Sequence, residues 1–261
     1  MYDFTIKHYT QLLKSLQDAG FFFQTYEQYS RKPHARALIL RHDVDARAQN
    51  SLRFARIQAE RGIAGTYYFR MVSQSYDEAI IKEMVGLGHE VGYHYETMDT
   101  CRGNLDEAYG EFCRNLEQFQ KLTAIKTISM HGSPLSKFDN RDIWKKYDYK
   151  KLGIVAEPYF DIDFNQLYYI TDTGRRWDGH LYNVRDKATK ESPITNRDFL
   201  KLQFHSTSDI IKALEEGTFP NQAMFNFHPQ RWNDAFLPWT KELLLQNMKN
   251  QAKRILILLR K

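Results

Sequence analysis

The run ALILRHDVDA contains two aspartates, Asp43 and Asp45, one residue apart at the end of an apolar stretch. Alternate side chains of a β-strand point to the same face, so both carboxylates would point one way and Val44 would point into the packed layer. Two carboxylates held a few ångströms apart repel each other unless one is protonated or a cation neutralises them. The pair therefore indicates a bound metal ion, although a solvated strand end or a helix N-cap at Asp45 would also explain it.

Three further apolar runs end in a histidine. They are HEVGYH ending at His94, KTISMH ending at His131 and AMFNFH ending at His228. Active sites of parallel α/β proteins lie at the carboxyl ends of the strands, so residues distant in sequence would converge there. Imidazole and carboxylate are standard ligands of Zn²⁺ and related divalent ions. A single such histidine would more often be structural, but four polar strand ends in one chain predict a shared metal-binding site.

The strands that must carry these residues alternate with helical patterns. We predict strands near 36–42, 65–70, 89–94, 126–131 and 223–228, separated by apolar residues at helical spacing. Such alternation is typical of βα units and a mainly parallel sheet. The stretch 132–205 is irregular and rich in Asp, Asn, Gly and aromatic residues, which predicts long loops over the site.

The composition narrows the class of protein. The chain has 261 residues, 42% of them apolar, which suits one α/β domain of roughly 250 residues. Its basic residues are scattered, with no uninterrupted Lys/Arg block, which disfavours nucleic acid as a partner. No apolar run approaches the ~20 residues that span a bilayer, and residues 1–20 lack the pattern of a secretory signal. Cys101 and Cys113 fit a reducing compartment, so we expect a cytoplasmic protein.

Taken in order, these motifs resemble those of the polysaccharide deacetylases of carbohydrate esterase family 4, the NodB-homology proteins. The resemblance covers roughly residues 36–235, and the segment GFFFQTYEQY before it is similar to a cytoplasmic branch found with surface-polysaccharide biosynthesis. It implies a distorted (β/α) barrel with long loops at the carboxyl ends of its strands. One domain, 1–261, would then comprise a helical segment at 1–35, the barrel at 36–235 and a helix at 236–261.

The resemblance also implies roles for single residues. Asp43 matches the catalytic base, Asp45 a metal ligand, and His228 in FNFHPQRW the general acid. GHEVGYHYETM matches the second motif as far as the ligand His94, but Met98 stands where the second histidine of that motif is usual. MHGSP resembles the third motif, with His131 near the position where many relatives have arginine.

Because Met98 stands in place of the second histidine of the motif, the resemblance does not identify the third metal ligand. His131 is our first expectation, because imidazole is a good ligand and its strand should lie close to that of His94. Glu96 is the alternative ligand. A third explanation is weak or absent metal binding, which would leave a catalytically inactive carbohydrate-binding protein. If metal binds, we expect Zn²⁺, with Co²⁺, Ni²⁺ or Fe²⁺ as alternatives.

The function implied is hydrolysis of the N-acetyl group of an amino sugar in surface-polysaccharide biosynthesis, of the O-antigen or capsule kind. A metal ion would activate water, Asp43 would accept its proton, and His228 would protonate the departing amine. An amidohydrolase acting on a non-sugar amide is a further alternative.

Candidate substrate contacts come from the aromatic and arginine residues. Sugars are commonly held by aromatic faces, which favours Trp177 and Trp232, although both could equally pack in the core. Arginines could bind the carboxylate or phosphate of a nucleotide- or lipid-linked sugar. Asp172 would orient either His228 or a substrate hydroxyl. The full set of expected substrate-binding residues is Arg70, Glu96, Asp172, Trp177, Arg231 and Trp232.

Overall fold

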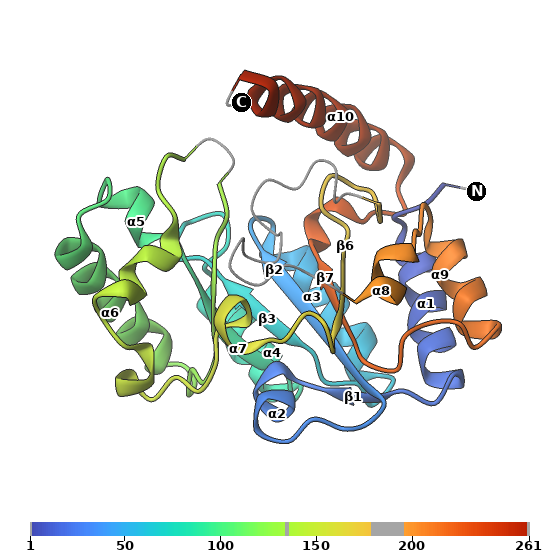
Figure 1. Ribbon diagram of the computed structural model, residues 1–261, viewed down its shortest axis with the longest axis horizontal. Coiled ribbons are helices and arrows are strands. Elements are labelled where there is room, and N and C mark those ends of the chain that lie inside the picture. The colour runs from blue at the N-terminus through green and yellow to red at the C-terminus, as the bar shows by residue number, and fades with distance from the viewer. Residues whose placement is uncertain (1, 134–135, 179–195, 260–261) are drawn as a thin grey trace.

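The computed structural model describes residues 2–133, 136–178 and 196–259, and within them seven parallel strands form one curled sheet. The strand order is β5-β4-β3-β2-β7-β6, and β1 pairs with the first residues of β2 (Figure 1). The bounds are β1 Phe22–Gln24, β2 Ala37–Val44, β3 Thr66–Phe69, β4 Glu90–Tyr95, β5 Ile128–Met130, β6 Tyr168–Thr171 and β7 Ala223–Phe227. This arrangement confirms the predicted α/β class and its distorted barrel.

Helices cover the outside of the sheet and connect its strands (Figure 1). The α-helices are α1 Ile6–Asp18, α2 Tyr26–Arg31, α3 Ala48–Ala59, α4 Glu78–Gly86, α5 Thr97–Thr100, α6 Leu105–Gln120, α7 Pro158–Asp161, α8 Arg197–Lys201, α9 Thr207–Glu215 and α10 Phe236–Leu259. Short 3-10 helices span Asn140–Lys145, Tyr149–Leu152 and Pro229–Arg231. None of the helices in the described ranges is long and apolar enough to cross a membrane.

Strand β2 lies at the centre of the sheet, and its eight residues are all buried. Its side chains alternate between two packed layers, as a strand buried on both faces requires. Leu40 and Val44 join the large apolar cluster formed with the helices, whereas Ile39 joins a smaller cluster inside the barrel. Arg41 and Asp43 share the face of Ile39, so the polar end of the strand points into the barrel.

The predicted strands all form, with small differences at their ends. His94 lies within β4, which extends to Tyr95, whereas His131 and His228 directly follow β5 and β7. All three histidines therefore lie at the carboxyl edge of the parallel sheet. The neighbouring strand order β5-β4-β3-β2-β7 brings them toward the end of β2, where Asp43 and Asp45 lie.

Candidate metal centre

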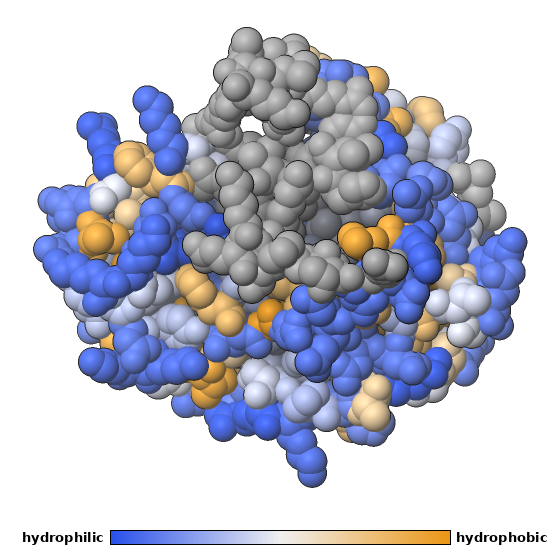
Figure 2. Space-filling view, viewed as in Figure 1, coloured by the Kyte–Doolittle hydropathy of each residue, from blue (hydrophilic) through white to orange (hydrophobic). Residues whose placement is uncertain are grey.

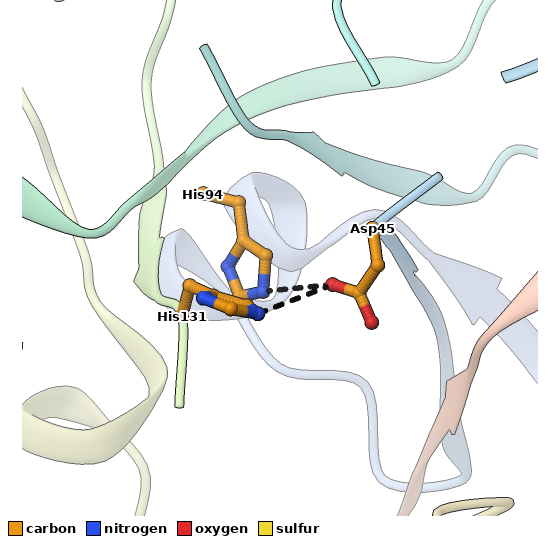
Figure 3. Close-up of side chains that lie close together, drawn as sticks. All are labelled: Asp45, His94 and His131. Carbon is orange, nitrogen blue, oxygen red and sulfur yellow. Dashed lines mark ion pairs between the residues drawn. The ribbon is translucent and has the colours of Figure 1, made fainter. Parts of the chain in front are cut away.

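Asp45, His94 and His131 come together at the carboxyl edge of the sheet (Figure 3). Asp45 Oδ1 lies 3.8 Å from His94 Nε2 and 3.7 Å from His131 Nε2. The three ligand atoms all lie within 4.8 Å of one another. Both imidazole rings point their Nε2 atoms at the same carboxylate oxygen, which is the arrangement of groups that converge on one cation.

The surroundings of Asp45 Oδ1 fit such a cation. This atom is buried and has no hydrogen-bond partner among the described residues. An unpaired buried carboxylate oxygen is costly, so a missing positive partner is the simplest physical explanation. Two ligands of a tetrahedral zinc ion, each ~2.0–2.1 Å from it, are about 3.3 Å apart. The observed separations are slightly longer than this, and a modest movement of the side chains would close the site around an ion.

The protonation state of His94 suits a metal ligand. His94 Nδ1 lies 2.9 Å from the carbonyl oxygen of Ser129, to which it donates a hydrogen bond. Burial lowers the pKa of His94 to about 4, so the ring is neutral at neutral pH. The proton on Nδ1 leaves the lone pair of Nε2 free to face Asp45, and the carbonyl fixes the orientation of the ring.

His131 is oriented by a carboxylate instead. Its Nδ1 lies 3.0 Å from Glu96 Oε2, in an ion pair whose geometry departs from a regular hydrogen bond. Burial would lower the pKa of His131, but the carboxylates of Glu96 and Asp45 outweigh it and the pKa is raised. Arg70 donates to both carboxylate oxygens of Glu96, at 2.9 Å to Oε1 and 2.7 Å to Oε2. Glu96, expected as a ligand or a substrate contact, is therefore occupied by Arg70 and His131.

Asp43 is neutralised by an arginine that the sequence analysis did not assign to the site. Arg41 Nε and Nη2 donate to the two oxygens of Asp43 at 2.8 and 2.9 Å. Asn226 on β7 also donates to Asp43 Oδ2, at 3.0 Å. Burial would raise the pKa of Asp43, but Arg41 outweighs it and the pKa lies below its usual value. Asp43 is thus a permanent carboxylate, 3.8 Å from His94 Nε2.

His228 is held by a buried network around Asp172. His228 Nδ1 donates to Asp172 Oδ1 at 2.5 Å, and the His228 backbone N–H donates to Oδ2 at 2.9 Å. Trp232 Nε1 donates to Oδ2 at 2.6 Å, and Arg231 Nη1 to Oδ1 at 3.1 Å. Asp172 was expected to orient either His228 or a substrate hydroxyl. Its contacts match the first of these roles. Arg231 contacts the same carboxylate, which is a different partner from the substrate group expected.

Asp45 connects the histidine pair to His228. Its second oxygen, Oδ2, lies 3.9 Å from His228 Nε2 and accepts a hydrogen bond from Gln230 Nε2 at 3.2 Å. His228 Nε2 therefore faces the centre of the site, because its Nδ1 is bound to Asp172. The four predicted strand ends meet at one place in the molecule.

Trp177, Trp232 and Met98 are all buried in the core. Trp177 and Trp232 are buried and pack against Phe227, which is the core position that the sequence left open for both rings. The Trp177 indole donates to Thr207 Oγ1, and the Trp232 indole to Asp172. Met98 packs in the core. Aromatic content alone does not distinguish a ring that packs from a ring that binds.

A cavity of about 420 Å³ opens beside the histidine pair. Arg70, Glu96 and His131 line it. The remaining lining residues are Asp99, Ser133, Ser136, Lys137 and Phe138. Pro134, quoted above in the third motif, lies outside the described residues. The cavity is large enough for a small ligand and offers it charged, hydroxyl and aromatic groups.

Comparison with known proteins is limited to solved structures, since no family model and no curated relative matches the sequence. A wild-type CE4 family pseudoenzyme from Bacillus anthracis has a TM-score of 0.44 at 13% identity, over 85% of this chain and 62% of that chain. A pseudoenzyme mutant with restored enzymatic activity has a TM-score of 0.44 at 12% identity, over 85% of this chain and 64% of that chain. The Xyl-CE4 domain of a multidomain xylanase, from the hindgut metagenome of Trinervitermes trinervoides, has a TM-score of 0.39 at 12% identity, over 84% of this chain and 85% of that chain. The chain thus spans less than two thirds of the length of the pseudoenzyme chains.

Proposed function

We propose that this protein is a metal-dependent deacetylase that hydrolyses the N-acetyl group of an amino sugar in surface-polysaccharide biosynthesis, of the O-antigen or capsule kind, in the cytoplasm. The observation that carries the proposal is the unpaired Oδ1 of Asp45, faced by the Nε2 atoms of His94 and His131. Asp43 Oδ2 lies 3.8 Å from His94 Nε2, and His228 Nε2 lies 3.9 Å from Asp45 Oδ2. The order of the sequence motifs supports the same chemistry, and the free thiols of Cys101 and Cys113 suit a reducing compartment.

Asp45, His94 and His131 would hold the ion, with Zn²⁺ favoured by the imidazole and carboxylate ligands and Co²⁺, Ni²⁺ or Fe²⁺ as alternatives. Such an ion supplies Lewis acidity, which polarises a carbonyl oxygen and lowers the pKa of water. His131 would replace the histidine lost at Met98. Glu96 would act behind His131 as the carboxylate that orients the ring, a common arrangement for histidine ligands.

Asp43 would orient the attacking water and accept its proton. Its carboxylate is ionised at neutral pH because of Arg41, and Asn226 fixes its plane. The same ion pair lowers the basicity of Asp43. Asp43 could therefore accept a proton only from a water molecule whose pKa is already lowered.

His228 would donate a proton to the departing amine. With Nδ1 bound to Asp172, the second ring nitrogen, Nε2, is the atom that faces the site. The Asp172 carboxylate stabilises the imidazolium form and holds the ring in position, as in other histidine–aspartate pairs. Breaking the C–N bond would release acetate and leave a free amino sugar.

The cavity beside His131 is the proposed site for the sugar. Lys137 and the hydroxyls of Ser133 and Ser136 line it, together with the ring of Phe138. Arg70 also lies in its wall, where Glu96 neutralises the guanidinium. Lys137 offers a cation that would suit a sugar whose carrier bears phosphate, as in a nucleotide- or lipid-linked substrate.

The test is acetate release by purified protein reconstituted with Zn²⁺ or Co²⁺. Chitooligosaccharides, nucleotide-linked N-acetylhexosamines and small acetamides would be compared as substrates. We expect acetate only from N-acetyl sugars and only with metal. Turnover of small acetamides alone would instead identify an amidohydrolase that acts on non-sugar amides.

A second candidate is a carbohydrate-binding protein without catalysis. The Arg41–Asp43 ion pair favours it, because a carboxylate held by two guanidinium hydrogen bonds is a weak base. Sugar binding in the absence of any acetate release, with or without metal, would support this candidate over the deacetylase.

A further inference from the structure

Helix α10 is attached to the rest of the protein through polar side chains. Gln246 and Asn250 are buried, and Asn250 Nδ2 donates to the carbonyl oxygen of Gly174 at 2.9 Å. The Gln246 amide donates to Asn250 Oδ1 at 3.1 Å. Among residues 236–251, whose side chains the structure describes, the inner contacts of α10 thus include these hydrogen bonds together with the Trp239 ring, which lies against the Arg175 guanidinium.

The opposite side of α10 is apolar and exposed. Leu237, Leu244 and Met248 are 78%, 60% and 70% exposed. Their spacing of seven and four residues places them on one helix face. The face of the molecule drawn in Figure 2 is mainly hydrophilic, with apolar side chains scattered between polar ones. The run of large apolar side chains on α10 differs from this pattern and needs an apolar partner.

The sequence around α10 also carries the charge of the protein. Residues 236–261 contain six basic residues and one acidic residue, a net charge of +5. The whole chain has 37 basic and 32 acidic residues, so residues 1–235 contain 31 of each and are neutral. All of the excess positive charge thus belongs to residues 236–261, of which 236–259 form α10.

We propose that the outer face of α10 binds an anionic membrane surface. A basic helix with large apolar residues on one face is the pattern of helices that lie in the membrane interface. Leu237, Leu244 and Met248 would enter the acyl boundary, and the basic residues would attract the anionic headgroups. A second copy of the chain fits less well, because two segments with the same charge of +5 would repel each other.

Membrane binding through α10 would bring the candidate active site close to the headgroups. Gly174 and Arg175, which bind Asn250 and the carbonyl oxygen of Trp239, belong to the turn that directly follows Asp172. Figure 1 shows α10 at the upper edge of the molecule, apart from the helices that cover the sheet. If the proposed deacetylase function holds, the sugar substrate would be carried by a membrane lipid.

The experiment is flotation of the full chain with phosphatidylcholine vesicles, with and without about 30% phosphatidylglycerol, at low and high salt. We expect at least about tenfold more binding to the anionic vesicles, with a decrease at high salt. The triple variant Leu237→Ser, Leu244→Ser, Met248→Ser should lose about tenfold or more of this binding. Leu200→Ser, which removes an exposed leucine outside α10, is the matched control and should bind like the wild type.

Results of two kinds, from vesicle binding and from ultracentrifugation, would overturn the proposal. One is equal binding to neutral and anionic vesicles, or binding that the triple variant retains. The other is a dimer in analytical ultracentrifugation that becomes monomeric in the triple variant, which would identify a second copy as the partner. Vesicle binding is measured without substrate, so its failure is separate from a failure of acetate release.

Discussion

Arg41 and Asp43 form a two-pronged ion pair inside the barrel, with N–O distances of 2.8 and 2.9 Å, and both side chains are almost completely buried. They are two residues apart on the same face of β2. Arg41 keeps Asp43, the proposed catalytic base, ionised. Asn226 donates a hydrogen bond to the same carboxylate.

Replacing Asp43 by Asn should abolish turnover and leave metal bound. The amide can keep the position of Asp43 but cannot accept a proton, so kcat should fall by about 10²-fold or more. Because the variant leaves Arg41 without its acidic partner, Asp43→Asn/Arg41→Gln is the control for folding. Acetate release and metal content are measured together on each protein. An Asp43→Asn enzyme with wild-type activity would refute the role of base.

Replacing Arg41 by Gln should destabilise the fold. The change leaves the Asp43 charge buried without its partner, a loss that typically costs about 3–5 kcal/mol. Urea unfolding at neutral pH measures it, and Arg56→Gln is the matched control because Arg56 pairs with Glu83 on the surface. We expect little change in the control. Equal unfolding midpoints for the two variants would mean that the buried ion pair stabilises the fold no more than the surface ion pair does.

Replacing Asp172 by Asn should reduce kcat by about 10²–10⁴-fold with little change in metal content. The amide cannot stabilise a protonated His228 as the carboxylate does, and it can favour the wrong tautomer. His228→Gln should cost a similar factor, and the double variant should be no worse than the more damaging single variant. Additive losses in kcat would show that Asp172 does not act through His228.

Glu157 should make stability depend on pH. Burial raises its pKa to about 7, although the backbone N–H groups of Met130 and Tyr159 donate to it. The folded state thus keeps a proton that the unfolded chain loses near pH 4.5. This contribution is complete below about pH 4.5 and is lost as the pH rises to about 7, on the order of 3 kcal/mol. Urea titrations at several pH values measure it.

In Glu157→Gln this part of the pH dependence should disappear, whereas the exposed Glu60→Gln should behave like the wild type. Buried histidines such as His94 oppose this trend equally in both proteins, so the test is the difference in unfolding free energy between wild type and Glu157→Gln. A difference that stays constant between pH 4.5 and 7 would contradict the assignment.

The sequence predicts the position of the site better than its contacts. Strand alternation and the rule that active sites lie at strand ends were sufficient to bring Asp43, Asp45 and the three histidines together. The same alternation places Arg41 beside Asp43, so this ion pair could have been found from the sequence. Asn226 could not, because its register against β2 depends on the pairing of distant strands.

Other features of the structure could not be predicted from the sequence, for physical reasons. Strands β1 and β6 have only three and four residues and were not predicted, whereas β5 and β3 have the same lengths and were predicted because their apolar runs end in His131 and Arg70. The burial of Trp177 and Trp232, neither of which lies in a strand, depends on packing against Phe227 of β7. Residue type indicates that a tryptophan needs an apolar surface, and only the fold determines whether that surface is the core or a ligand.

The most direct test of the account is the metal content of the wild type and of His131→Ala, measured by mass spectrometry after reconstitution with Zn²⁺ and dialysis. We predict about one ion per wild-type chain and a loss of affinity of about 10²-fold or more in the variant. His205→Ala, which removes an exposed histidine paired with Asp178, should retain the ion. A wild type without stoichiometric metal, or a His131→Ala protein that binds it equally well, would contradict the three-ligand site.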